Sequence, residues 1–205
     1  MLIVLGILLF IYLLIQSSSA SHKKKSQKEK AAFWNQEYKA NATRKADISV
    51  LPYITVPLEA LPFTETKEAE LITVQNSIRN LAVEPILNLT GISNTELKLK
   101  YGVANITYLM QCDENFTLLI KNILKWGSYL YDRNKWEEAV VVLEYGIQIK
   151  SDIGKNYTLL AEIYKSTGRM DKINGLIQTA ESLNTLSKEN IVTALKEIRR
   201  SNPTF

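Results

Sequence analysis

Small and large apolar residues recur at a fixed distance in the second half of the chain. Residues 120–186 read as two copies of one helical hairpin, offset by 34 positions. Each copy predicts a first helix, a short turn and a second helix, with the turns at 132–134 and 167–169. A 34-residue period is typical of stacked helical hairpins. Six slots agree in this register: Gly127 with Ala161, Leu130 with Tyr164, Trp136 with Met170, Ala139 with Ile173, Leu143 with Ile177, and Gly146 with Ala180.

The sizes of the residues in these slots predict how the helices pack. A small residue at Gly127 or Ala161 lets the two helices of one hairpin approach closely, and Gly146 or Ala180 does the same between neighbouring hairpins. A plain helical bundle with a coincidental offset is the alternative. Under the repeat interpretation, twelve residues pack the hairpins together: Trp126, Gly127, Leu130, Ala139, Leu143, Gly146, Leu160, Ala161, Tyr164, Ile173, Ile177 and Ala180.

The N-terminal pattern is different, because residues 1–15 form an unbroken apolar run and residues 16–20 are polar but uncharged. Twenty helical residues span roughly 30 Å, the thickness of a bilayer core. This predicts a transmembrane helix over residues 1–20. A cleaved signal peptide is the alternative, since Ser18-Ser19-Ala20 resembles a small-residue cleavage site. A lysine cluster follows the run and no basic residue precedes it, which favours a retained single-pass anchor in the cell membrane with a cytoplasmic C-terminal domain.

The positive charge of the chain is concentrated directly after the apolar run. Residues 22–45 hold eight basic and two acidic side chains, a net charge of +6, whereas residues 46–205 hold 17 basic and 19 acidic ones. A domain that grips nucleic acid would carry its positive charge on the fold. We therefore expect anionic lipid contact rather than nucleic-acid binding, with binding of nucleic acid by the tether as a rival hypothesis. The lysines concerned are Lys23, Lys24, Lys25, Lys28 and Lys30.

Two further segments separate the anchor from the repeats. Residues 21–47 are interpreted as a solvated basic tether up to residue 30, followed by a juxtamembrane helix over 31–45. That helix would place Trp34 and Tyr38 either at the lipid headgroups, or against the folded domain or in solvent. In residues 48–64 a proline recurs every five positions, which disfavours helix and predicts an extended segment. Its apolar density favours packing along the helical domain, with occupation of a partner's groove as the sharper alternative.

Residues 65–200 are predicted to form the helical-repeat domain, with repeat units at about 120–153 and 154–187 and a tail at 201–205. Ser93 and Glu96 match a capping box, which predicts the start of a helix. Asp113 is placed to cap a helix over residues 114–131. Residues 185–200 predict a terminal helix with Ser187 as its N-cap, and such a helix would close the end of a solenoid.

The repeat residues resemble the tetratricopeptide repeat family over about a third of the chain. The first copy has Gly127 and Ala139 of the family pattern and the second has Tyr164 and Ala180, whereas the family's late proline is absent. The resemblance implies an all-α fold built as a helical-hairpin solenoid, with a concave surface for a protein partner of unknown identity. The Lys and Asn clamp that some members use for a peptide carboxylate is not reproduced. Candidate partner-binding residues are Lys121, Leu124, Ser128, Tyr131, Lys155, Thr158, Glu162 and Lys165.

The order of segments carries a second resemblance. A short apolar segment, a lysine tether, the block at residues 46–58 and the helical repeats follow one another as in membrane-anchored repeat proteins of low-GC Gram-positive bacteria. This resemblance implies a place at the membrane but no activity.

The sequence contains no motif for catalysis. It has no Gly-rich phosphate loop and no CxxC, HExxH or GxSxG pattern. His22 and Cys112 are the only residues of their types and stand ninety positions apart, which excludes most nucleophile–base pairs. Glu137 and Glu138 are assigned to a solvated helix face. We therefore expect a membrane-anchored scaffold or adaptor without enzyme activity, cofactor or metal, and an enzyme with carboxylate-only chemistry is the remote alternative.

An exported or envelope-facing protein of the same fold is the main alternative for location. The sequence holds five Asn-x-Ser/Thr triplets, which would be candidate glycosylation sites only in an exported domain. They begin at Asn41, Asn88, Asn105, Asn115 and Asn156.

Overall fold

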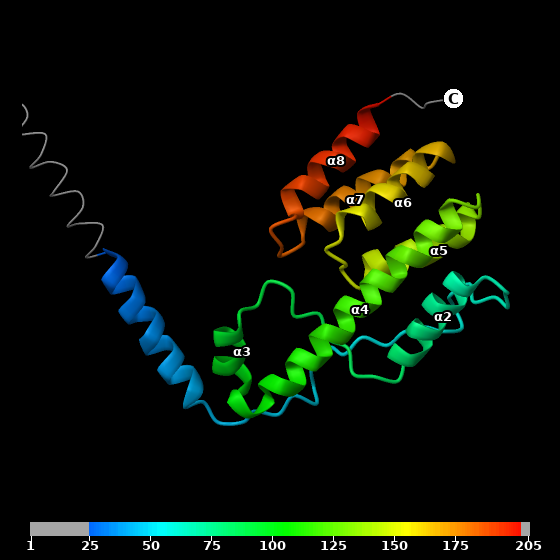
Figure 1. Cartoon of the computed structure of the whole chain (residues 1–205). Coiled ribbons are helices and arrows are strands. Elements are labelled where there is room, and N and C mark those ends of the chain that lie inside the picture. Colours follow the sequence, from blue (N-terminus) through cyan, green and yellow to red (C-terminus); the bar gives the residue numbers. More distant parts are fainter. Residues whose placement is uncertain (1–24, 202–205) are drawn as a thin grey trace, which may run out of the picture. The chain divides into compact units, whose positions relative to one another are not determined.

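The computed structural model describes residues 25–201 (Figure 1), and this part of the chain is all-helical, with no strand. The all-α prediction is therefore confirmed. The predicted transmembrane helix at 1–20 and most of the tail at 201–205 lie outside the described residues. Within them, no helix combines the length and apolar character that crossing a bilayer requires. Residues 25–41 are helical, followed by α2 (Ala69–Leu81), α3 (Asn94–Tyr101), a 3₁₀ turn (Val103–Asn105), α4 (Ile106–Tyr131), α5 (Trp136–Gln148), α6 (Gly154–Ser166), α7 (Met170–Glu181) and α8 (Lys188–Arg200).

The chain divides into two compact units, of which the first combines the described part of Met1–Asp47 with Ser93–Ile106. In this unit the helix over residues 25–41 packs against α3. The Glu37 carboxylate accepts hydrogen bonds from Lys98, at 2.8 Å, and from the Thr95 hydroxyl, and Ala40 is fully buried. The helix includes residues 25–30, which the sequence assigned to a tether. Ion pairing and burial on α3 thus fix the orientation of this helix within its unit.

The capping box predicted at the start of α3 is confirmed. The Ser93 hydroxyl accepts from the Glu96 backbone N–H, and the Glu96 carboxylate accepts from the Ser93 N–H at 2.8 Å. The helix ends at Gly102, whose φ of +82° suits glycine and whose missing Cβ leaves room for the Arg44 carbonyl. Asn105 then donates to the Ala46 carbonyl at 2.9 Å. Residues 44–46 are therefore held beside the C-terminal end of α3.

The second unit combines Ile48–Ile92 with the chain from Thr107 onward, and it contains the predicted repeats. Helices α5, α6, α7 and α8 pack in sequence, each on the next, and α8 also packs on α6 (Figure 1). The second helices of the two hairpins, α5 and α7, begin at Trp136 and Met170, 34 residues apart. All twelve residues expected to pack the repeats are buried.

Two glycines in this unit occupy positions where a side chain would collide with a neighbouring helix. A Cβ at Gly127 in α4 would lie 2.4 Å from Leu143 Cδ2 in α5, the other helix of the same hairpin. A Cβ at Gly146 in α5 would lie 2.9 Å from the Asn156 amide in α6, the first helix of the next hairpin. The absent side chains therefore set the distance between helices both within a hairpin and between hairpins.

The proline-spaced segment contains no helix in the structure and lies along the second unit. Ile54 donates its backbone N–H to the Ile86 carbonyl at 2.9 Å, and Val56 and Leu61 are buried in the main core. Phe63 packs on Trp126, with 4.8 Å between ring centroids. This segment thus covers apolar side chains of α2 and α4 that would otherwise face water.

The helix start predicted at Asp113 is wrong. Asp113 does not cap a helix, because α4 runs without interruption from Ile106 to Tyr131. The Asp113 carboxylate instead accepts the backbone N–H of Leu89 at 3.0 Å and so holds the loop that precedes α3. At α8, Ser187 stands at the N-cap position, as predicted, but its side chain makes no capping hydrogen bond.

Candidate functional site

The candidate partner surface lies on α4 and α6, the first helices of the two hairpins. Three of its predicted residues, Leu124 and Ser128 from α4 and Lys155 from α6, line one cavity of about 280 Å³. The cavity brings together residues about 30 positions apart in sequence, from α4 and from the start of α6. We call it the first-helix cavity; its other lining residues are Glu70, Lys125, Tyr129, Asp132 and Arg133.

The other predicted surface residues are distributed along the same helices. Burial, and then the negative charge of Glu162 in α6, raise the pKa of the Tyr131 phenol in α4. Lys121 is exposed, and the Thr158 hydroxyl donates to the Lys155 carbonyl in its own helix. Lys165 donates to the Ser201 hydroxyl at 2.7 Å, beyond the end of α8. Lys165 therefore does not line the first-helix cavity.

One cation of the first-helix cavity, Arg133, already forms an ion pair. The Arg133 guanidinium pairs with Glu68 at 2.5 Å and lies 3.5 Å from the centroid of the Tyr129 ring. Hydrogen bonds from Tyr129 and Arg133 lower the pKa of the Glu68 carboxyl, which therefore stays ionised. Cation–π contact and ion pairing hold the guanidinium at the edge of the cavity.

The remaining charges of the cavity are unpaired within the described part of the chain. Lys125, Lys155, Glu70 and Asp132 take part in none of its ion pairs. Leu124 lines the same cavity, so the lining combines an aliphatic side chain with charges of both signs. Protein interfaces likewise combine apolar and polar side chains.

A second, larger cavity was not predicted from the sequence. It has a volume of about 550 Å³, within the range of small-ligand and peptide pockets. Its walls come from the proline-spaced segment, the loop before α3, the C-terminal end of α5 and the loop after α7. The lining residues are Pro52, Ile54, Thr55, Asn88, Thr90, Tyr145, Gln148, Ile149, Lys150, Asp152, Ser182, Leu183, Asn184 and Thr185.

Hydrogen bonds from side chains define the walls of this larger cavity. The Asn88 amide donates to the carbonyls of Ile149 and Lys150, both at 3.2 Å, and Tyr145 donates to the Thr55 carbonyl at 3.4 Å. Burial raises the pKa of Tyr145 to about 12, so this phenol is neutral at physiological pH. Together with Lys150 and Asp152, the amides, the hydroxyls and this neutral phenol can bind a polar ligand.

Part of the lining of the larger cavity follows the 34-residue spacing of the repeats. Ile149 and Lys150 leave α5, and Leu183 and Asn184 stand 34 positions later, after α7. The two loops after the second helices thus contribute equivalent positions to one wall. Asn88 also lines the cavity but has no counterpart at this spacing, because it lies outside the repeats.

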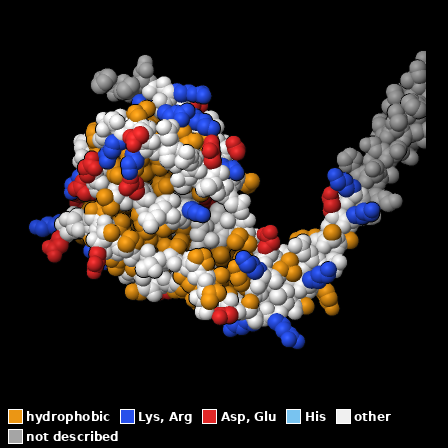
Figure 2. Space-filling view, turned by 180° about the vertical axis from the view of Figure 1, so that it is seen from behind, with side chains coloured by type: hydrophobic (Ala, Val, Ile, Leu, Met, Phe, Trp, Pro, Cys, Tyr) orange, Lys and Arg blue, Asp and Glu red, His pale blue; other side chains and the backbone are white. Residues whose placement is uncertain are grey.

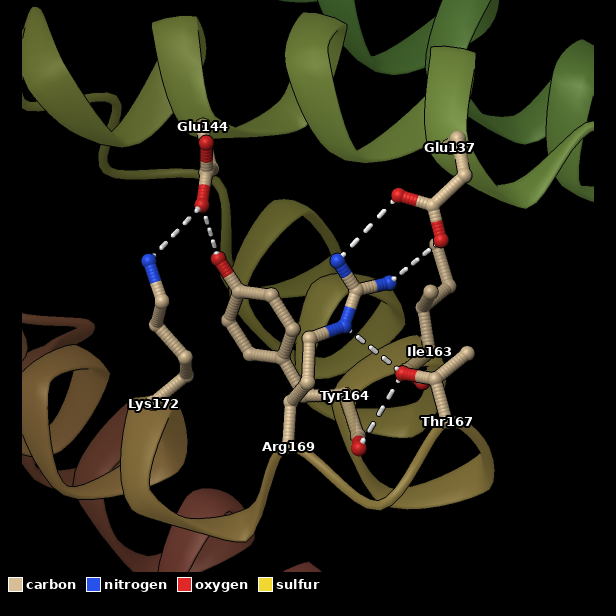
Figure 3. Close-up of polar contacts among 7 residues, drawn as sticks. All are labelled: Glu137, Glu144, Ile163, Tyr164, Thr167, Arg169 and Lys172. Atoms are coloured by element: carbon tan, nitrogen blue, oxygen red, sulfur yellow. Dashed lines mark hydrogen bonds and ion pairs between the residues drawn. The ribbon is translucent and has the colours of Figure 1, made fainter.

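A polar junction joins α5 to the turn between α6 and α7 (Figure 3). The Arg169 guanidinium donates to both carboxylate oxygens of Glu137, at 3.0 and 3.2 Å, and its Nε donates to the Thr167 hydroxyl at 2.9 Å. The Glu144 carboxylate accepts from the Tyr164 hydroxyl and pairs with Lys172 at 3.8 Å. The sequence placed Glu137 on a solvated face; its side chain is 76% exposed, yet it holds a bidentate ion pair across two hairpins.

Neither a metal-binding cluster nor an exposed cysteine occurs among the described residues. Between residues 25 and 201, no group of three or more His, Cys, Asp or Glu side chains could hold a metal ion. Cys112 is fully buried, and burial raises the pKa of its thiol, which disfavours the nucleophilic thiolate. Comparisons with protein-family models, with curated proteins and with solved structures find no match to this chain.

Proposed function

We propose that the chain is a membrane-anchored scaffold or adaptor whose helical hairpins, of tetratricopeptide type, bind a protein partner without catalysis. The observation that carries this proposal is the first-helix cavity, in which α4 and α6 contribute to one surface. Helical-repeat proteins use surfaces of this kind, made by equivalent helices of successive repeats, to bind peptides and proteins.

The chemistry of the cavity favours an extended peptide segment with both charge signs. Leu124 offers an apolar contact, Lys125 and Lys155 offer cations, and Glu70 and Asp132 offer carboxylates. A partner with an apolar side chain flanked by acidic and basic residues would complement this lining. Residues 1–20 would hold the surface near the membrane, and the lysines from Lys23 to Lys30 would contact anionic lipids.

The proposal can be tested by photocrosslinking in the native membrane. A photoreactive amino acid at Ser128 should capture a protein, and Lys125→Glu with Lys155→Glu in the same chain should reduce capture by about tenfold. Lys165→Glu is the matched control, because Lys165 lies outside the cavity, and it should leave capture unchanged. Equal capture by the double variant and the control would contradict the assignment of the binding surface.

The side of the membrane on which the helical domain lies has to be tested in a separate experiment. A cytoplasmic domain should resist protease added to intact cells and be degraded once the cells are opened. Degradation in intact cells would instead support the exported form of the same scaffold. This result concerns only the location of the domain and leaves the binding surface unaffected.

A further inference from the structure

The helix over residues 25–41 exposes aromatic side chains that its own unit leaves uncovered. Trp34 is 67% and Tyr38 is 77% exposed, and Phe33 is 51% exposed with its ring edge-on to Trp34. Large aromatic side chains in solvent lose the favourable burial that they obtain elsewhere in the molecule. Three of them together on one helix mark an interaction surface.

The exposed aromatics share a face with a cation. Lys30, Trp34 and Tyr38 stand four residues apart, so they follow one another along one side of the helix. Glu37 and Ala40 lie on the side that packs against α3. Figure 2 shows basic and hydrophobic side chains together along this helix. Lys30, Trp34 and Tyr38 are all exposed, so they form an aromatic and basic stripe that is open to solvent.

The charge balance of the helix is positive. Residues 25–41 contain four lysines and two glutamates, and one of these glutamates, Glu37, is already paired with Lys98. Lys25, Lys28, Lys30 and Lys39 form no ion pair within the described part of the chain. A surface with this composition complements an array of negative charges.

We propose that the helix over residues 25–41 lies on an anionic lipid surface, with Trp34 and Tyr38 at the level of the headgroups and Lys30, on the same side of the helix, against the lipid phosphates. Trp and Tyr are enriched at this depth because one part of each ring system is apolar and the other is polar. Lysines flanking such residues add electrostatic attraction to anionic lipids.

The apolar run at residues 1–20, which precedes this helix, favours an anionic bilayer as the binding partner over other polyanions such as nucleic acid. This inference rests on the proposed anchor at residues 1–20. Four residues separate that anchor from Lys25, and so short a connection spans at most roughly 15–20 Å. An inserted anchor would therefore keep the stripe within reach of the headgroups at all times. A single-stranded nucleic acid could also stack on the aromatics, so it is included as an outcome of the test.

The test uses the full chain in vesicles and a label at single cysteines. Cys112 is fully buried, so the unsubstituted chain should not react with a thiol-directed fluorophore. Trp34→Cys and Tyr38→Cys, in separate chains, place the label on the stripe. Val83→Cys and Leu186→Cys are matched controls, at positions 84% and 101% exposed in the other unit. Circular dichroism shows whether each labelled chain keeps its helices.

In vesicles with anionic lipid, we expect acrylamide to quench the labels at 34 and 38 about twofold less than those at 83 and 186. Lipids with a nitroxide near the headgroup should quench only the labels at 34 and 38. Zwitterionic vesicles, or about 1 M salt, should weaken this shielding because the lysine–phosphate attraction is lost or screened.

Failure of the inference and failure of the anchor give different results. If carbonate washing releases the chain from the vesicles, the anchor is wrong. If the chain stays bound but positions 34 and 38 are as open to acrylamide as position 186, the lipid contact of the stripe is overturned while the anchor stands. Equal shielding in zwitterionic vesicles overturns the requirement for anionic lipid. Shielding by an added oligonucleotide but not by lipid assigns the stripe to nucleic acid and overturns the inference.

Discussion

Replacement of Gly127 with alanine tests the packing of α4 against α5. The added Cβ would lie 2.4 Å from Leu143 Cδ2 and 2.7 Å from Leu143 Cγ, where ordinary van der Waals contact begins at 3.4 Å. The methyl group therefore needs about 1 Å of additional space. Leu143 is fully buried, so its side chain has to shift within the packed core or α4 and α5 have to move apart.

The expected magnitude is a balance of two effects. Overpacking of a core costs about 1–3 kcal/mol, while alanine is favoured over glycine within a helix by about 1 kcal/mol. We expect Gly127→Ala to lower the free energy of unfolding by up to about 2 kcal/mol. For a chain of this length, that corresponds to a melting temperature lower by up to about 8 °C. Urea unfolding in mild detergent, followed by far-ultraviolet circular dichroism, measures the change.

A matched control is available in α7. Gly175 is exposed, and a Cβ there would meet no atom within 4 Å. Gly175→Ala should therefore stabilise the fold by about 0.5–1 kcal/mol. In a Leu143→Ala background the obstacle is absent, so Gly127→Ala should lose its destabilising effect there. If Gly127→Ala stabilises the native chain as much as Gly175→Ala does, the close approach of α4 and α5 is refuted.

Three further predictions concern buried polar groups. The Tyr157 hydroxyl is buried without a hydrogen-bond partner in the described structure, so Tyr157→Phe should raise the free energy of unfolding by about 1 kcal/mol. Tyr164→Phe removes a hydrogen bond to Glu144 and should lower the free energy of unfolding by a similar amount, about 1 kcal/mol. Changes of the same sign in the two variants, measured by urea unfolding, would contradict this reasoning. Burial raises the pKa of Tyr157 to about 12, above the ordinary value of 10 expected when unfolded. The folded state therefore holds this proton more tightly, and the free energy of unfolding should fall as the pH rises from 10 to 12. Because Tyr157→Phe lacks the phenol, its decrease over this range should be smaller than that of the native chain by about 2–3 kcal/mol. Asn156→Ala should cost about 1–3 kcal/mol because it removes a buried donor to a main-chain carbonyl, while Asn41→Ala, at an exposed position, should leave the urea midpoint unchanged.

The helical class and the hairpin spacing could be predicted because they depend on local periodicity. Apolar residues at helical spacing, glycines at fixed offsets and the Ser93–Glu96 capping box each act within a few residues along the chain. Asp113 shows where local reasoning fails. A carboxylate before a helical pattern has the composition of an N-cap, but here it accepts from Leu89, 24 residues earlier, in the middle of a longer helix.

The candidate site was accessible to sequence analysis only in part. Leu124, Ser128 and Lys155 could be selected together because the repeat offset predicts that first helices are neighbours. The larger cavity depends on contacts that the offset does not contain, such as the hydrogen bonds from Asn88 to carbonyls 61 and 62 residues away. The pairing of Glu137 with Arg169 across 32 residues was missed for the same reason.

Four of the five Asn-x-Ser/Thr triplets have a structural explanation. The side-chain nitrogen is the atom to which a glycan would be attached, and in these four residues it donates to main-chain carbonyls. Asn88 donates to carbonyls 61 and 62 positions away, Asn105 to that of Ala46, Asn115 to that of Pro85, and Asn156 to that of Leu143. Asn41 is exposed.

An asparagine amide can hold a carbonyl that lies outside regular secondary structure, as Asn88, Asn105 and Asn115 do, whereas Asn156 in α6 binds a carbonyl within α5. Three of the four residues, Asn105, Asn115 and Asn156, are themselves buried, so an attached glycan would require the fold to open. These four asparagines therefore have a structural role that does not depend on export: three hold carbonyls of connecting segments, and the fourth joins two neighbouring helices.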